Sequence, residues 1–128
     1  MFKVGLISGS VFSMLSVILG AFGAHYLKNT LSEYSLSIFQ TGVFYQFVHS
    51  LGILFISLLS HSLDNINLNL SIWFFISGIF LFSGSLYLLA LTDVKWLGAI
   101  TPIGGMFFIL GWFTLIIKSF KIWGVHDL

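Results

Sequence analysis

Residues 41–61 read TGVFYQFVHSLGILFISLLSH, and this run contains no Asp, Glu, Lys or Arg. It lies within an uncharged interval of 30 residues, 34–63. A helix needs about 20 apolar residues to cross the hydrocarbon core of a bilayer. A single strand in lipid would leave its backbone polar groups without partners. The run therefore predicts one membrane-spanning helix.

Three more uncharged intervals divide the rest of the chain. They cover residues 4–27, 65–92 and 96–117 and are 24, 28 and 22 residues long. Each is long enough for one crossing and too short for two. The sequence therefore predicts a single all-α domain, residues 1–128, folded as an integral membrane four-helix bundle. We expect its helices at about 4–25, 41–61, 70–92 and 102–121.

The composition agrees with a lipid environment. Hydrophobic residues make up 58% of the chain and charged residues 7%, with a mean hydropathy of +1.06. A water-soluble domain carries about 25% charged residues. The net charge of +1 and the lack of Arg leave no basic surface for a nucleic acid, and the lack of Cys excludes thiol chemistry. We therefore expect the lipid bilayer, and no nucleic acid, as a partner.

The lysines predict the orientation. Four crossings place both termini on the same side as the 61–69 turn. That side would carry three lysines and the other side two: Lys3, Lys118 and Lys121 against Lys28 and Lys95. Because positive loops stay in the cytoplasm, we expect both termini there.

The predicted helix ends carry further signals. Residues 26–40 hold the longest polar stretch and are expected to form a short interfacial helix. Thr101 and Pro102 resemble an N-cap followed by proline at the first helical position. The uncharged run after Lys3 is longer than the 7–15 residues of a signal-peptide core, so we expect it to remain as the first helix. The tryptophans lie mostly near span ends, as interfacial anchors do: Trp73, Trp96, Trp112 and Trp123.

Small residues gather on one face of the first predicted helix. They are Gly5, Gly9, Ser13, Ser16, Gly20 and Gly23. Lipid tails give helices no hydrophobic reason to associate, so such a stripe indicates close backbone packing. The pattern does not say whether the partner helix belongs to the same chain or to another copy. Since the third and fourth predicted helices also carry small residues, we expect a homo-oligomer.

The second predicted helix carries a polar face. Tyr45, Gln46 and His49 are three or four residues apart, so their side chains can meet. Gln and His are costly against lipid and should face protein or water. One interpretation is a hydrogen-bond network that fixes the bundle. The other is a polar pocket or a proton-handling site.

No catalytic constellation accompanies this face. The four acidic residues all fall in predicted loops or the tail, and the four histidines lack a metal-ligand spacing. We therefore expect no catalytic residue, metal or cofactor, and no enzyme. A haem held by His25 and His49 from two helices remains the alternative.

Four motifs resemble the bacterial membrane proteins of the domain-of-unknown-function 423 (UPF0382) family, and the eukaryotic transmembrane protein 256 group is similar. The motifs are Leu19–His25, Gln40–His49, Phe82–Thr92 and Ile100–Trp112. The motif positions that we single out are Gly20, Gly23, His25, Gln40, Gly84, Ser85, Pro102, Gly104 and Gly105. The resemblance implies a small four-helix protein of the cytoplasmic membrane and supplies no activity.

Two functional hypotheses follow. The first is a structural or accessory role in membrane or envelope integrity, because packing stripes occur without catalytic groups. The alternative is a small oligomeric transporter or channel that uses the polar face of the second helix. Other membrane proteins stay open as partners.

Overall fold

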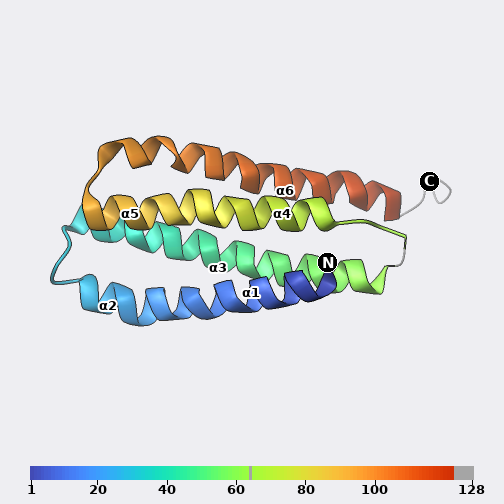
Figure 1. Cartoon of the computed structure of the whole chain (residues 1–128), viewed down its shortest axis with the longest axis horizontal. Coiled ribbons are helices and arrows are strands. Elements are labelled where there is room, and N and C mark those ends of the chain that lie inside the picture. The colour runs from blue at the N-terminus through green and yellow to red at the C-terminus, as the bar shows by residue number, and fades with distance from the viewer. Residues whose placement is uncertain (64, 123–128) are drawn as a thin grey trace.

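The computed structural model describes residues 1–63 and 65–122 and consists of four long helical rods (Figure 1). The first rod joins α1 (Phe2–Val17), the π-helical turn η1 (Ile18–Gly23) and α2 (Ala24–Leu27). The second is α3 (Glu33–Ser62), and the third joins α4 (Asn69–Gly78), the π-helical turn η2 (Ile79–Ser83) and α5 (Gly84–Thr92). A short 3₁₀ turn, η3 (Lys95–Ala99), leads into α6 (Thr101–Ile122).

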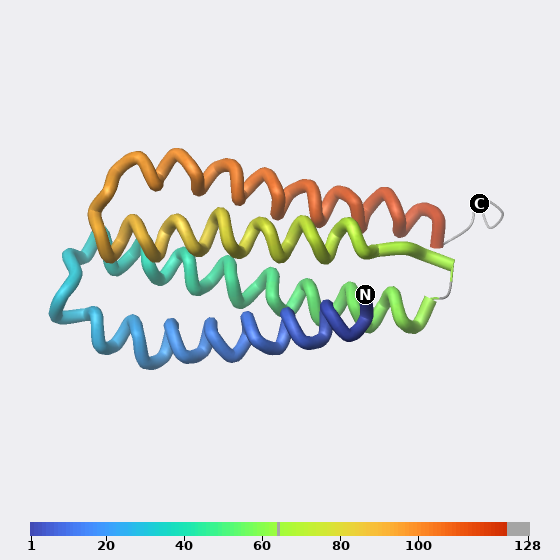
Figure 2. The backbone as a smooth tube through the Cα atoms, in the orientation of Figure 1, coloured from blue at the N-terminus to red at the C-terminus, as the bar shows by residue number. Residues whose placement is uncertain are grey.

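All four rods are long and apolar enough to cross a membrane, with lengths of 26, 30, 24 and 28 residues when η3 is counted with α6. This confirms the predicted integral membrane four-helix bundle. Successive rods run in opposite directions, so the start of α1 and the end of α6 lie at the same end of the bundle (Figure 2).

The rods divide into an inner and an outer pair. α3 packs against α1 and against the α4–α5 rod, which in turn packs against α6. In the most apolar stretches of α3 and of the α4–α5 rod, 44% and 39% of the residues are buried, against 17% in each outer rod. α3 therefore contacts neighbours on both sides, and its polar residues have helices within reach.

The main apolar core lies between these inner helices. Its fully buried members from α3 and α4 include Ile53, Ile56, Ile72 and Phe75, and Phe108 joins them from α6. A smaller cluster at the other end of the bundle contains Ala24, Phe39 and Ala90.

The second rod begins earlier than the sequence indicated. Ser32 caps α3, since its hydroxyl accepts a hydrogen bond from the Ser35 backbone N–H at 3.1 Å, and Glu33 occupies the first turn. Both features stabilise a helix N-terminus. Residues 33–40 are therefore continuous with the membrane-spanning helix, and the separate interfacial helix expected over 26–40 does not form.

Glycines set how closely the rods approach. A Cβ at Gly5 would overlap the Ser57 hydroxyl of α3, and one at Gly9 would lie 2.8 Å from the Leu54 side chain. Ser13 donates a hydrogen bond to Ser50 at 2.9 Å. The first part of the small-residue stripe, Gly5 to Ser13, is thus packed against α3 of the same chain.

Candidate functional site

The candidate site is the set of polar side chains buried along α3. Gln46 and His49 are 3% and 5% exposed, and Ser50 and Ser57 are fully buried. A buried polar group is costly unless it is hydrogen-bonded. Each of these side chains has a partner, so the site is best described by what each one binds.

Gln46 joins three helices. Its Nε2 donates to the backbone carbonyl of Phe12 in α1 at 2.9 Å, and its Oε1 accepts from the Tyr87 hydroxyl in α5 at 2.6 Å. The Tyr87 ring can approach because Gly42 has no side chain, and a Cβ there would lie 2.8 Å from the ring. Both ends of the Gln46 amide are therefore engaged within the bundle.

His49 is hydrogen-bonded through both ring nitrogens. Nδ1 lies 2.7 Å from the Tyr45 carbonyl oxygen, which can only accept, so Nδ1 carries the proton. Nε2 lies 3.0 Å from the indole nitrogen of Trp112 in α6, which can only donate. This pair of partners fits a neutral imidazole. The ring also stacks on Phe108, with 3.6 Å between centroids.

The three predicted site residues point to different neighbours. Gln46 faces α1 and α5, and His49 faces α6. Tyr45 is 38% exposed and lies against the Phe82 ring, with 4.5 Å between centroids. The Tyr45 and His49 rings are 6.0 Å apart by centroid, and the Tyr45 group bonded to His49 is its backbone carbonyl.

Serines complete the network between helices. Ser83 in η2 donates to the Gly42 carbonyl at 2.7 Å. Ser85 in α5 lies 2.7 Å from the Thr101 hydroxyl at the start of α6. Thr101, which the sequence suggested as an N-cap, is the first residue of α6 and binds another helix instead.

Sequence reasoning missed two members of the site, Tyr87 and Trp112. Trp112 was expected as an interfacial anchor, but it lies midway along α6 and binds His49. Trp112 is 38% exposed. The signal that could have identified it was its place within a long apolar run, since an indole N–H away from water needs an acceptor within the protein. Trp73 and Trp96 are exposed, and Trp123 lies outside the described residues.

The family-motif positions fall into several environments. Gly20 and Gln40 line a groove of about 440 Å³ between the first rod and α3, together with the helix-packing residue Ser16. Gly23 faces the Phe39 ring, Gly104 lies against the backbone of Phe82, and Gly105 is near the Phe82 ring. A Cβ added at Gly84 would have no neighbouring atom within 4 Å. The side chains of His25 and Pro102 are exposed.

The histidines and acids do not converge. Among residues 1–63 and 65–122, no group of three or more His, Asp or Glu side chains could hold a metal ion. His25 is exposed on α2, whereas His49 is buried in the middle of α3 with both nitrogens engaged. The site thus consists of hydrogen-bonded helix contacts.

Four apolar spans and a buried polar network define a small multi-pass membrane protein. Residues 19–105 match the family model described as a protein of unknown function, DUF423. A UPF0382 membrane protein of Staphylococcus epidermidis is 49% identical over 122 residues, which cover 95% of this chain and 99% of that protein. UPF0382 membrane protein YwdK of Bacillus subtilis is 41% identical over 120 residues, 93% of this chain and 98% of that protein. The chain belongs to the DUF423 (UPF0382) family. No solved structure matches it.

Proposed function

We propose that the protein is a non-catalytic component of the bacterial cytoplasmic membrane with a structural or accessory role in membrane or envelope integrity. The observation that carries this proposal is that the two buried polar side chains in the middle of α3, Gln46 and His49, are hydrogen-bonded to other parts of the bundle. Gln46 binds Phe12 and Tyr87, and His49 binds Tyr45 and Trp112.

The alternative, a small transporter or channel, has less support. A polar path for ions or solutes requires polar groups that are free to bind them. His49 fits its partners as a neutral ring, because a proton on Nε2 would face the indole N–H of Trp112. The same bond that stabilises the bundle therefore opposes proton transfer through this residue.

Substitution of His49 separates the two functions. His49→Gln should retain most of the stability, because an amide oxygen can accept from Trp112. His49→Leu should cost about 1–3 kcal/mol, since the Trp112 indole N–H, within a membrane-spanning helix, loses its acceptor. Thermal unfolding in mild detergent measures both changes.

Two functional assays accompany these variants. One measures the permeability of the cell envelope to a dye, and the other measures proton flux into vesicles. A strain without the gene should admit more membrane-impermeant dye, and His49→Gln should restore the barrier as the unchanged protein does. Vesicles carrying the purified protein should show no more proton flux than empty ones. Flux that both substitutions abolish would establish the transporter instead, and a deletion strain with an intact barrier would contradict the integrity role.

The proposed orientation has both termini in the cytoplasm. It is supported by the three lysines at the end of the bundle that holds the start of α1, against two at the other end. A reporter fused after Leu128 should be active in the cytoplasm, and one inserted within residues 28–32 should report the outside. Equal signals would contradict the four-span topology, and exchanged signals would reverse the orientation.

Self-association remains a proposal, and the structure changes where an interface would lie. Gly5 and Gly9 of the α1 stripe pack against α3, whereas a side chain at Gly84 in α5 would meet open space. Gly84→Leu should therefore lower the oligomer mass measured by light scattering without unfolding the chain. Gly9→Leu should instead destabilise the chain itself, because its side chain would meet Leu54 and the Ser50 carbonyl. A monomer before any substitution would rule out the homo-oligomer.

A further inference from the structure

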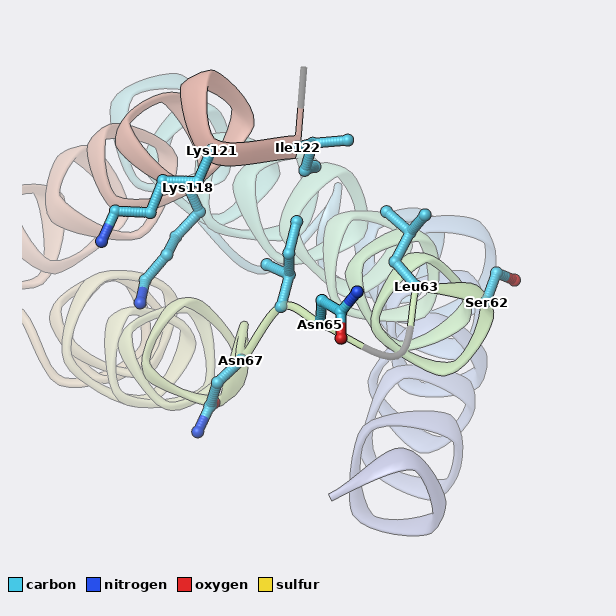
Figure 3. Close-up of a pocket in the computed structure, with 8 residues that line it drawn as sticks. Ser62, Leu63, Asn65, Asn67, Lys118, Lys121 and Ile122 are labelled. Atoms are coloured by element: carbon cyan, nitrogen blue, oxygen red, sulfur yellow. The ribbon is translucent and has the colours of Figure 1, made fainter. Parts of the chain in front are cut away.

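A polar pocket of about 500 Å³ lies at the end of the bundle where α3 and α6 both finish (Figure 3). Lys118 and Lys121 enter it from the last turns of α6, and Asn65 and Asn67 come from the connection between α3 and α4. Apolar side chains, among them Leu63 and Ile122, form the rest of its lining. The pocket is separate from the buried network along α3.

The polar groups of this pocket are mainly donors. Lys118 and Lys121 are three residues apart on one helical face, and their side chains extend in the same direction (Figure 3). The Asn67 Oδ1 accepts the Asn69 backbone N–H at 3.0 Å, which leaves the Asn67 NH₂ group to donate. Of the residues in 1–63 and 65–122, only Lys95 and Asp93 form an ion pair, and they lie at the opposite end.

Lys118 and Lys121 carry like charges three residues apart on one helix, and an anion bound near both would offset their repulsion. Lysine binds phosphate as a point charge, and amide N–H groups add directed hydrogen bonds. The donors of this pocket therefore suit an anion such as a phosphate group.

The source of that phosphate follows from the position of the pocket. It lies at the end of four membrane-spanning rods, where lipid headgroups are the nearest phosphates. Leu63 and Ile122 border it with apolar surface that suits the upper part of an acyl chain. Basic pockets between membrane helices bind anionic headgroups for the same reasons. We propose that this pocket binds the headgroup of an anionic phospholipid, independently of the function proposed above.

Native mass spectrometry of the protein in neutral detergent tests this site with added phosphatidylglycerol or phosphatidylcholine. We expect one phosphatidylglycerol to bind at least about tenfold more tightly than phosphatidylcholine, given two lysines at the headgroup level. The double variant Lys118→Gln and Lys121→Gln should lose this preference. The matched control, Lys28→Gln with Lys95→Gln, removes the same charge from the opposite end and should keep it.

Three outcomes would overturn the proposal. The first is equal affinity for the two lipids. The second is equal loss of preference in both double variants, which would show an effect of net charge alone. The third is protection from unfolding by inorganic phosphate, at matched ionic strength, that equals the protection by phosphatidylglycerol, because the ligand would then be a free anion. Thermal unfolding without lipid verifies that the lysine variants are folded.

Discussion

Gly104→Ala should unfold the bundle at a clearly lower temperature, with a loss of roughly 3 kcal/mol or more. A Cβ at this position would overlap the backbone nitrogen of Phe82 and lie 2.6 Å from its Cα and 2.7 Å from the Leu81 carbonyl carbon. Backbone atoms cannot move aside as the tip of a flexible side chain can. The substitution therefore has to separate α6 from η2, and with it the contacts that Phe108 makes in the core.

The neighbouring glycine supplies the control. A Cβ at Gly105 would lie 3.7 Å from the Phe82 ring, which is ordinary van der Waals contact. Gly105→Ala should be neutral or stabilise by up to about 1 kcal/mol, since alanine is the better helix former. Thermal unfolding of both variants in the same detergent makes the comparison. Equal stability of the two would show that α6 does not approach η2 as closely as described.

Gln46→Leu should produce the second large loss, about 2–4 kcal/mol, from one buried hydroxyl left without its acceptor and one further hydrogen bond lost. The Tyr87 hydroxyl would lose its acceptor, and the Phe12 carbonyl would lose one of its donors. A leucine of similar size keeps the packing, so the loss reports the hydrogen bonds. The control is Gln40→Leu on the same helix, where the exposed side chain should change stability by less than about 0.5 kcal/mol.

A double variant tests the cause of this loss. Tyr87→Phe removes the hydroxyl that Gln46→Leu leaves unpaired, so the two changes together should cost less than their sum. Strict additivity would mean that the bond between Tyr87 and Gln46 contributes nothing to stability. Chemical or thermal unfolding of the four proteins of the cycle gives the coupling energy.

The sequence was sufficient to predict the four membrane-spanning helices, because a long uncharged run in a bilayer can satisfy its backbone polar groups only as a helix. It also identified the small-residue face of α1, although only the structure assigned that face to α3. It did not give the partners of Gln46 and His49. Apart from the Tyr45 carbonyl on the same helix, those partners lie 34, 41 and 63 residues away along the chain. Spacing on one helix shows which side chains are neighbours, but not which other helix faces each of them.

The start of α3 was missed for a different reason. A polar stretch near a membrane suits either an interfacial helix or the extension of a spanning one. The Ser32 cap distinguishes these two possibilities. It starts a helix at Glu33 that continues without interruption into the apolar run. Length and composition cannot make that distinction, whereas capping chemistry can.

Because of the π-helical turn η2, the third rod packs against its neighbours with different faces before and after the turn. Its wider turn holds one residue more than an α-helical turn, which rotates everything beyond it by about 100° relative to an unbroken helix. Before the turn, Phe75 packs into the core with α3 and α6; after it, Tyr87 reaches Gln46. The same rod therefore makes contacts in two different directions, one through α4 and one through α5. Any shortening of residues 79–83 would act like a twist applied to α5, turning Tyr87 away while leaving α4 in place.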